Sequence, residues 1–402
     1  MALIVQKFGG TSVKDAQRVM NVARRVTETY AKGNSVVVVV SAQGDTTDEL
    51  IEKAMEINPK ANKREMDVLL STGEQISIAL LAMAIEKLGY PAKSLTGWQA
   101  GFVTDSTHGN SRIRRIETER IKNELDKGNI VIVAGFQGVS RYDDITTLGR
   151  GGSDTSAVAI AAACRADLCQ IYTDVDGVYT ADPRLVPEAQ KLDEISYDEM
   201  LELATLGAQV LHNRSVEMAK KYNVPLEVLS SLEEKPGTVI KEVARMEKML
   251  IKGVAKDDKV TRISIIGVED IPGVAFRIFS ALAARKINVD IILQSVGRDG
   301  TKDVTFTVSD GQREEAVEVM EGLKDTLRAH SITCDGVTKL SVVGAGMESN
   351  PGVAAMMFEA LSEAAVNIQM IATSEIKISV LIDRADAARA LRAVHNAFVA
   401  KE

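Results

Sequence analysis

The chain has 402 residues, with 48 Lys and Arg against 56 Asp and Glu, so its formal net charge is −8. This acidic balance argues against a protein whose main task is to bind nucleic acid or an anionic membrane. Aromatic residues make up only 4 % of the chain, so a platform for stacking bases or sugars is not expected either. The longest apolar runs, Ile78–Ile85 and Ala157–Cys164, have eight residues, whereas a membrane-spanning helix needs about 20.

The first part of the chain, up to about residue 245, alternates apolar strands with amphipathic helices. Continuous β-branched or aliphatic runs predict strands at Ala2–Lys7, Ser35–Ser41, Ile130–Ala134, Leu168–Thr173 and Leu226–Leu229. Helices are predicted at Asp15–Tyr30, Thr47–Ile57, Gln75–Leu88, Ile113–Asp126, Thr155–Arg165, Tyr197–Leu206 and Val216–Lys221. Strands of this kind suit a sheet covered on both faces, so we expect an α/β sandwich. Turn residues at Glu233–Thr238, followed by a polar run, put the domain boundary near residue 245.

Beyond this boundary the sequence repeats. Ser264–Ser295 and Ser341–Ser374 align with one two-residue insertion, and Pro272-Gly273 matches Pro351-Gly352. Each copy predicts a strand, a Pro-Gly turn, a helix and a strand, then a further strand (Asp303–Ser309 or Lys377–Ile382) and a second helix. The repeat therefore predicts two tandem α+β modules.

The second module lacks the final strand that its fold expects. A spare strand, Met249–Ala255, precedes the first module. We expect it to pair with the second module and to hold the two modules together.

Cysteines and histidines offer no metal site by their spacing. The sequence begins without the basic and apolar segments of a signal peptide, and Cys164, Cys169 and Cys334 show no CxxC spacing, so we expect reduced thiols in a cytoplasm. The histidines form no zinc-binding pair, and each is expected to be a surface or packing residue: His108, His212, His330 and His395. Any metal ion would be held by oxygen atoms, as Mg²⁺ usually is.

Two glycine-rich segments lie between a predicted strand and a predicted helix. In Lys7–Ser12, Gly9 and Gly10 let the backbone approach a ligand, and the lysine supplies a point charge for a phosphate. In Gly149–Ser156, Ser153 or Asp154 is a natural helix N-cap, and Arg150 suits a carboxylate or phosphate. Each segment taken alone also fits a simple turn.

Two further segments carry acidic residues. Thr173–Arg184 holds three aspartates at the carboxyl end of a strand, where ligands bind in open α/β sheets. Ser71–Gln75 places Glu74 where a helix is predicted to begin, so this pattern also fits a cap.

In combination and order, these four segments resemble the amino-acid kinase family, specifically the aspartate kinases. The repeated tail resembles the paired ACT regulatory domains of those kinases, so the resemblance covers essentially the whole chain. It implies a three-layer αβα sandwich of the carbamate-kinase type in residues 1–245 and a linker with one strand in 246–262. Two ferredoxin-like ACT domains are implied in 263–335 and 336–402.

The resemblance also implies an activity, which is ATP- and Mg²⁺-dependent phosphorylation of the β-carboxylate of L-aspartate. This reaction is the first step toward lysine (through diaminopimelate), threonine and methionine. Lysine, threonine or both are expected to inhibit through the ACT domains. A homodimer or higher oligomer is expected through those domains, and Met246 or Met249 could start a separate small subunit.

Site residues follow from the same resemblance. Catalytic roles are implied for Lys7 and Asp154. Binding of ATP or phosphate is implied for Lys7, Phe8, Gly9, Gly10, Ser41, Thr173, Asp174, Tyr179 and Arg184, and Gly44 is expected nearby. Binding of aspartate is implied for Asp45, Thr47, Glu49, Glu74, Arg150, Gly151 and Ser153. Many relatives have Lys where this chain has Gln209, and no catalytic role is assigned to that glutamine.

Effector-binding residues are expected around the Pro-Gly turns, because each turn offers backbone N–H groups to an effector carboxylate. The first module contributes Asp270, Gly273, Val274, Ala275, Asn288, Asp290 and Gln294. The second contributes Gly352, Val353, Asn367, Ile368 and Ser374. A Pro-Gly turn is also simply a good helix start.

The sequence is also compatible with two other functions. A kinase of glutamate or acetylglutamate would share the glycine segments and Arg150, although the tandem repeat and the Ser-Thr-Gly-Glu segment favour aspartate. A non-catalytic amino-acid sensor is the second alternative, and the intact Lys7, Glu74, Arg150 and Asp154 argue against it.

Overall fold

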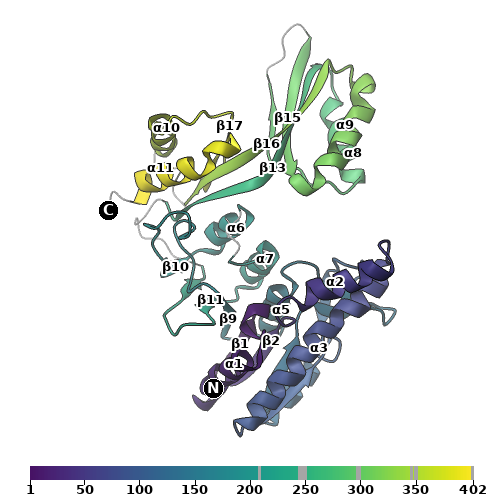
Figure 1. Ribbon diagram of the computed structural model, residues 1–402, viewed down its shortest axis with the longest axis vertical. Coiled ribbons are helices and arrows are strands. Elements are labelled where there is room, and N and C mark those ends of the chain that lie inside the picture. The colour runs from purple at the N-terminus through teal and green to yellow at the C-terminus, as the bar shows by residue number, and fades with distance from the viewer. Residues whose placement is uncertain (207–209, 243–250, 296–299, 345–346, 348–351, 400–402) are drawn as a thin grey trace. The chain divides into compact units, whose positions relative to one another are not determined.

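The computed structural model describes residues 1–206, 210–242, 251–295, 300–344, 347 and 352–399. The chain divides into two compact units (Figure 1). The first contains Met1–Tyr179 and Lys191–Met246, and the second contains Thr180–Gln190 and Glu247–Glu402. The predicted boundary near residue 245 lies outside the described residues.

The first unit is built on an eight-stranded sheet. In spatial order its strands are β10 (Glu194–Ile195), β12 (Thr238–Ile240), β11 (Leu226–Ser230), β9 (Leu168–Thr173), β1 (Leu3–Phe8), β2 (Ser35–Val40), β6 (Ile130–Ala134) and β3 (Ala92–Leu95). Neighbouring strands from β11 to β3 are parallel, and β12 is antiparallel to β11. The five strands predicted for this unit are all present within one or two residues of their expected ends.

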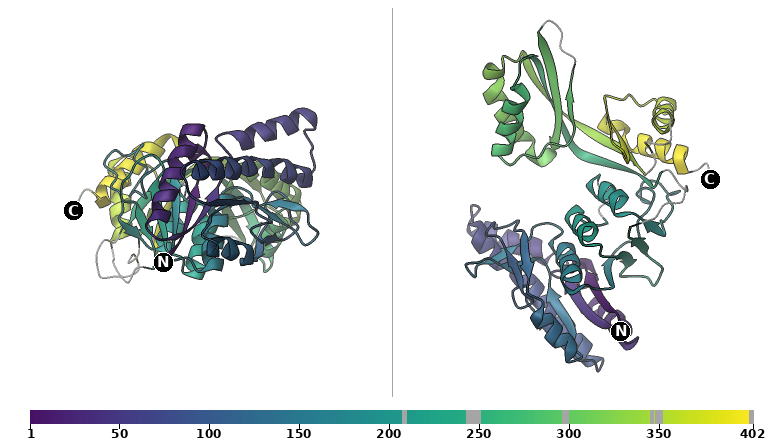
Figure 2. Two further views of the ribbon diagram at one scale, coloured as in Figure 1. Left: turned by 90° about the horizontal axis from the view of Figure 1, so that it is seen from below. Right: turned by 180° about the vertical axis from the view of Figure 1, so that it is seen from behind.

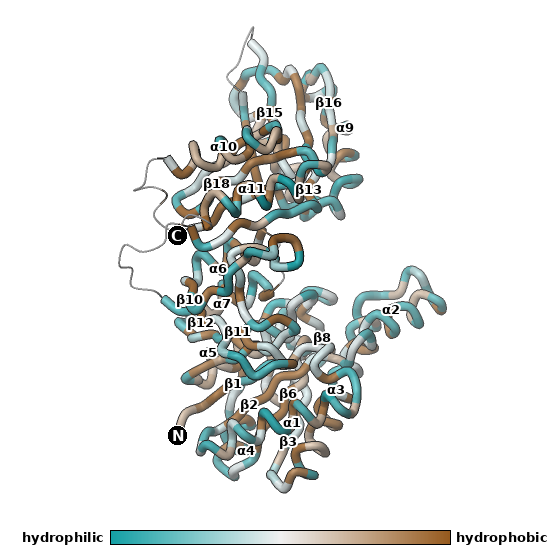
Figure 3. Tube along the Cα trace, turned by 60° about the vertical axis from the view of Figure 1, so that its left-hand side comes forward, coloured by the Kyte–Doolittle hydropathy of each residue, from teal (hydrophilic) through white to brown (hydrophobic). Residues whose placement is uncertain are grey.

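Helices cover both faces of this sheet. The helices of this unit are α1 (Ala16–Ala31), α2 (Thr46–Ile57), α3 (Lys63–Lys87), α4 (Glu119–Asp126), α5 (Gly152–Cys164), α6 (Tyr197–Thr205) and α7 (Asn213–Tyr222), and a short 3-10 turn covers Gly10–Ser12. Of these, α2 packs on α3 and buries none of its own residues. Val36, Val38 and Val40 of β2 share a core with α1 and α3. Val37 and Val39 are equally buried, and because side chains alternate along a strand they face the other side, where α5 packs. This is the expected αβα sandwich, and β2 and β6 are correspondingly hydrophobic along their length (Figure 3).

The helices α5 and α7 each begin three residues before their predicted starts, and two other predicted helices differ by more. The helix expected from Gln75 begins twelve residues earlier, at Lys63, because its first turns bury polar residues and so lack an apolar stripe. The helix expected from Ile113 begins at Glu119. Ile113–Ile116 instead forms β5, which pairs with β4 (Phe102–Thr104) in a small sheet completed by β7 (Gln137–Val139) and β8 (Ile145–Thr147).

The helix α3 is also the one described helix whose length and apolar composition would suit a membrane span. It packs against α1, β3 and β8 and buries the carboxylates of Asp67 and Glu74. These contacts identify α3 as a core helix of the first unit.

The second unit is built on one six-stranded sheet. Its strands in spatial order are β14 (Ile292–Gln294), β15 (Thr301–Ser309), β13 (Gly253–Glu269), β16 (Ser331–Val343), β18 (Lys377–Ile382) and β17 (Met370–Thr373). Its helices are α8 (Val274–Ala284), α9 (Arg313–Leu327), α10 (Val353–Glu363) and α11 (Ala387–Val399), with 3-10 turns at Asp310–Gln312 and Arg384–Asp386. One core lies under α8 and α9 and another under α10 and α11.

The long strands β13 and β16 join the two modules. They pair from Gly253↔Val343 to Ile266↔Ser331, and Figure 2 shows them running from one pair of helices to the other. The expected pairing of the spare strand is present, because Gly253–Ala255 pairs with Ser341–Val343. Met249 lies outside the described residues.

The second unit also takes in Thr180–Gln190, so the predicted nucleotide segment Thr173–Arg184 is divided between the two units. Ala181 and Val186 join the core under α10 and α11. The Oγ1 of Thr180 lies 2.9 Å from the Nε2 of the buried His395.

Candidate active site

Lys7 and Asp154 form an ion pair at the carboxyl end of the central strand. Lys7 is the penultimate residue of β1, Asp154 lies in the first turn of α5, and 2.7 Å separates Nζ from Oδ1. The side chains are only 12 % and 13 % exposed. A carboxylate in the first turn of a helix is favoured by the helix dipole, so Asp154 is fixed where it holds the ammonium group of Lys7.

The glycine turn after β1 lies against the segment after β2. A Cβ on Gly10 would lie 2.7 Å from the carbonyl oxygen of Ala42, and the N–H of Gly44 donates to the carbonyl of Gly10 over 3.0 Å. The N–H of Ser41 donates to the carbonyl of Phe8 over 3.2 Å. The structure therefore brings the predicted phosphate-binding residues after β1 (Gly9, Gly10) next to Ser41 and Gly44 after β2. Residue 10 is a glycine because the backbone of Ala42 leaves no room for a side chain.

Glu74 is buried beside the same turn, inside α3 and not at a helix start as its sequence context predicted. Its Oε1 accepts a hydrogen bond from the N–H of Ala42 over 3.1 Å, and its Oε2 is buried without a hydrogen-bond partner. Gly73 permits this approach, since a Cβ there would lie 2.7 Å from the Cβ of Ala42. Burial raises the pKa of Glu74 to about 8. The unpaired oxygen can therefore accept a ligand cation once the carboxyl group is ionised.

Arg150 is exposed in the loop between β8 and α5. The N-cap of α5 is Gly151, not Ser153 or Asp154 as expected. This position requires glycine, because its φ is +66° and a Cβ there would lie 2.2 Å from the ring of His212. Ser153 and Asp154 follow inside the first turn. His212 in turn caps α7, and burial lowers its pKa.

The residues expected to bind aspartate from the α2 region lie at the surface. Asp45 precedes α2 and accepts the N–H of Glu49 through its carbonyl over 3.0 Å. Asp45 and Glu49 are exposed, and Thr47 is half-buried. Their roles stay predictions.

The predicted nucleotide segment continues from β9, which pairs with β1 so that Phe8 lies opposite Tyr172. Thr173 and Asp174 therefore end at the same edge of the sheet as Lys7 and Gly9, and the hydroxyl of Tyr179 donates to Asp176 over 2.8 Å. Burial is the main cause of the raised pKa of Tyr179. Arg184 belongs to the second unit, where it pairs with Asp182 over 2.8 Å.

Several predicted effector residues have definite partners in the second unit. Asp270 pairs with Lys302 over 2.8 Å, and Asp290 pairs with the buried Lys339 over 2.5 Å. Gly273 (φ +93°) and Gly352 (φ +112°) cap α8 and α10. Val274 and Val353 are buried, Ile368 is half-buried, and the remaining predicted residues are exposed: Ala275, Asn288, Gln294, Asn367 and Ser374.

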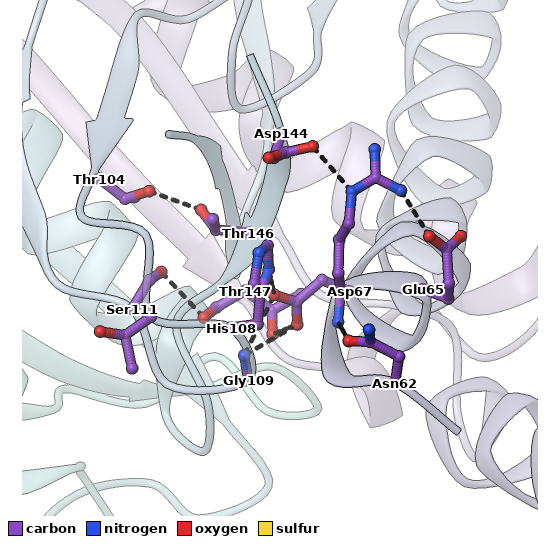
Figure 4. A network of polar contacts seen from close by, with 12 residues as sticks. Asn62, Glu65, Asp67, Thr104, His108, Gly109, Ser111, Asp144, Thr146 and Thr147 are labelled. Atoms are coloured by element: carbon purple, nitrogen blue, oxygen red, sulfur yellow. Dashed lines mark hydrogen bonds and ion pairs between the residues drawn. The ribbon is translucent and has the colours of Figure 1, made fainter. Parts of the chain in front are cut away.

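A buried polar network centred on Asp67 was not singled out from the sequence. Asp67 points from α3 toward His108, Gly109 and Thr147 (Figure 4). His108 is thus a hydrogen-bond partner of a buried carboxylate and more than the surface or packing residue expected. The available signal was the spacing, since Asp67 precedes Glu74 by seven residues and so shares its helix face.

Comparison with known proteins agrees with this geometry. The sequence profile of the Amino acid kinase family matches residues 2–230, and ACT domain profiles match residues 261–325 and 340–398. An aspartokinase of Geobacillus stearothermophilus is 54 % identical over 399 residues, covering 99 % of this chain and 97 % of that protein. The chain belongs to the aspartokinase family.

Solved structures of aspartokinases show the same fold. The aspartate kinase of Synechocystis is 46 % identical, with a TM-score of 0.57 over 99 % of this chain and 69 % of that one. Aspartokinase III of E. coli, crystallised with aspartate and ADP, is 24 % identical, with a TM-score of 0.84 over 98 % of this chain and 99 % of that one. The expected fold, a kinase sandwich with two ACT domains, is confirmed for this aspartokinase-family chain. Gln209, where the sequence departs from many relatives, lies outside the described residues.

Proposed function

We propose that this protein is an aspartate kinase, which transfers the γ-phosphoryl group of ATP to the β-carboxylate of L-aspartate and yields 4-phospho-L-aspartate and ADP. The observation that carries the proposal is the arrangement around Lys7. The ammonium group of Lys7 is largely buried and is held by Asp154 beside two glycine-containing backbone turns. Glu74 is bonded to the N–H of Ala42 in the second turn through Oε1, and its Oε2 is buried without a hydrogen-bond partner.

The chemistry needs positioning more than proton transfer. The side-chain carboxyl of free aspartate has a pKa near 4, so the attacking oxygen is ionised at neutral pH and no general base is required. Two anions must then be brought together, and the charge on the moving phosphoryl group must be neutralised. Lys7 supplies a positive charge at that place. Glu74 receives the α-ammonium group of aspartate, and Arg150 binds its α-carboxylate.

Mg²⁺ is expected to accompany ATP. Among the described residues no group of three or more His, Cys, Asp or Glu side chains could hold a metal ion. A Mg²⁺ ion typically uses one or two carboxylates together with substrate phosphates, and Asp154 and Asp174 are carboxylates at this edge of the sheet that fit such a role. The ion would neutralise charge on the phosphate oxygens when bound.

Regulation is proposed for the second unit. Lysine, threonine or both are expected to bind at the starts of α8 and α10 and to inhibit the kinase; Pro351 of the second predicted Pro-Gly turn lies outside the described residues. We further propose association of copies through the paired ACT domains, with a cytoplasmic location in keeping with the free thiols of Cys164, Cys169 and Cys334.

A substrate panel tests the proposed reaction. The purified protein is assayed for ADP release with ATP, Mg²⁺ and either aspartate, glutamate or N-acetylglutamate, and the acyl phosphate is trapped with hydroxylamine as its hydroxamate. Aspartate-dependent release of ADP with an equal yield of hydroxamate is expected. A preference for a glutamate substrate, or no ATP turnover with any of them, would contradict the proposal.

Substitutions separate the two substrates. Arg150→Ala should raise the KM for aspartate at least tenfold and leave the KM for ATP nearly unchanged, because the lost interaction involves the amino acid. An increase confined to the KM for ATP would remove Arg150 from the aspartate site.

A further inference from the structure

The carboxylate of Asp67 is fully buried on α3 and saturated with partners. Its Oδ1 accepts the hydroxyl of Thr147 over 2.5 Å, and both oxygens lie 3.1 Å from the N–H of Gly109. The Nδ1 of His108 lies 2.9 Å from Oδ2. A buried charge is costly unless it is paired and hydrogen-bonded, so a site this complete holds its partners firmly in place.

These partners lie far away in the sequence and belong to the small sheet. Thr147 is the last residue of β8 and is 80 positions from Asp67. Its carbonyl accepts hydrogen bonds from both the backbone N–H and the hydroxyl of Ser111, over 2.8 and 2.9 Å. Asp67 therefore connects α3 to the end of β8 and to the loop that contains Gly109 and Ser111.

The chain leads directly from Thr147 to Arg150, with two residues between them. Both of those residues are constrained. The carbonyl of Leu148 accepts a hydrogen bond from Arg214 over 2.7 Å, and a Cβ on Gly149 would lie 3.2 Å from the carbonyl oxygen of Gly109. The position of the Arg150 backbone thus follows from that of Thr147 and Gly109, which Asp67 holds.

Glu74 belongs to the same helix as Asp67 and lies seven residues further on, which is about two turns or roughly 10 Å along the axis on the same face. The helix α3 therefore carries Glu74 and, through Asp67, also anchors the loop between β8 and α5 that contains Arg150. The distance between the Glu74 carboxyl group and the Arg150 backbone thus depends on Asp67.

We propose that Asp67 is a positioning residue that fixes Arg150 relative to Glu74 and thereby sets the affinity for an α-amino acid. It does not touch substrate and acts through Thr147 and Gly109. This inference rests on the proposed function, in which Glu74 binds the ammonium group and Arg150 binds the α-carboxylate.

The test is the isosteric Asp67→Asn variant in the full chain. It should raise the KM for aspartate about tenfold or more, since a misplacement of about 1 Å can cost that much. The KM for ATP should stay within about twofold of the wild-type value, because Lys7 and the glycine turns do not depend on this network.

Asp144→Asn is the matched control. Asp144 immediately precedes β8 and accepts a hydrogen bond from Arg64 of α3 over 2.8 Å (Figure 4). Like Asp67, it is therefore a carboxylate that connects α3 to the β8 segment. That contact is at the surface, with side chains 45 % and 30 % exposed. We expect both KM values of this variant to match those of the wild type.

Thr147 provides a second pair of variants should Asp67→Asn fold poorly. Thr147→Val removes the hydroxyl and should raise the KM for aspartate, and Thr147→Ser keeps it and should restore the wild-type value. In the double variant of Asp67→Asn and Thr147→Val the increase should be smaller than the product of the two single effects, because both remove the same link.

The outcomes are distinguishable. A wild-type protein that neither binds nor phosphorylates aspartate overturns the proposed function and this inference with it. If the wild type is active, the inference alone is overturned by either of two results. In the first, the Asp67 and Thr147 variants lower the melting temperature without a selective rise in the KM for aspartate. In the second, the KM for aspartate and the KM for ATP rise equally.

Discussion

At the scale of single residues, Glu74 has the environment with the clearest consequence for pH dependence. Burial raises its pKa to about 8, so at pH 7 the carboxyl group of the free protein is mostly protonated. A protonated carboxyl cannot pair with the ammonium group of a substrate. The KM for aspartate should therefore fall several-fold between pH 6.5 and 8.5, as the carboxylate forms.

Initial rates at varied aspartate, measured across this pH range, check the prediction. Glu74→Gln should have a higher KM at pH 8.5 and should lose the pH dependence. The KM for ATP over the same range is the control. A pH profile that persists in Glu74→Gln would assign the titration to another group.

The same pKa has a consequence for stability. Between the ordinary pKa of glutamate, 4.5, and about 8 the folded protein binds more protons than the unfolded chain. The free energy of unfolding should therefore decrease as pH rises through this window. Urea unfolding at pH 8 should show Glu74→Gln to be more stable than the wild type, with a smaller difference at pH 5.

Lys7 is predicted to act on the rate of the chemical step. Lys7→Ala removes the positive charge next to the glycine turn and should lower kcat by roughly 10²-fold, the usual effect of losing one electrostatic group in an active site. The circular dichroism spectrum should remain that of the folded protein. Turnover close to that of the wild type would exclude Lys7 from the mechanism.

At the scale of elements, the start of α5 depends on Gly151. Its φ is +66°, and a Cβ there would lie 2.2 Å from the ring of His212, which caps α7. Gly151→Ala should destabilise the protein by about 1–3 kcal/mol from the conformation and the overlap together. It should also raise the KM for aspartate, since Arg150 immediately precedes this position.

Gly33→Ala separates the two causes. Gly33 has φ +85°, and nothing lies within 4 Å of a Cβ there. Urea unfolding of both variants measures the difference, which reports the contact with His212. Equal losses of stability would mean that the contact with His212 costs nothing and that the positive φ alone accounts for the glycine at residue 151.

At the scale of the whole molecule, the two units are expected to communicate. The carboxylate of Asp270 is 48 % exposed and pairs with Lys302, so an effector ammonium group can compete for it. Asp270→Ala should weaken inhibition by lysine or threonine by roughly 5- to 100-fold in the inhibitory concentration, since coupling energies of about 1–3 kcal/mol are typical. The uninhibited kcat should change little.

Glu269→Ala is the control for this prediction, because Glu269 is the adjacent residue and pairs with the exposed Arg328. Inhibition curves are measured with each amino acid singly and together. If neither amino acid at millimolar concentration changes the rate of the wild type, the proposed regulation is wrong.

The sequence by itself determined the five neighbouring strands β11, β9, β1, β2 and β6 of the first unit, the repeat and the residue types of the site. The run of five valines at 36–40 favours a strand because its residues are β-branched, and its unbroken apolar character is typical of a strand buried on both faces. The glycines beside Lys7 and around Arg150 indicate close backbone approach, and the structure shows it at Gly10 and Gly151. These features are local, so the order of residues along the chain is enough to reveal them.

Only the tertiary structure decided where these residues meet and what holds them. Ile113–Ile116 is a strand because β4 offers it a pairing edge, although the segment itself reads as the start of a helix. Glu74 lies in the middle of a helix, and its pKa is raised because the packing of α3 on Ala42 removes it from water. Asp67 reaches Thr147 across 80 residues. Contacts of this length depend on how helices and sheets pack, and no local pattern of residue types records that packing.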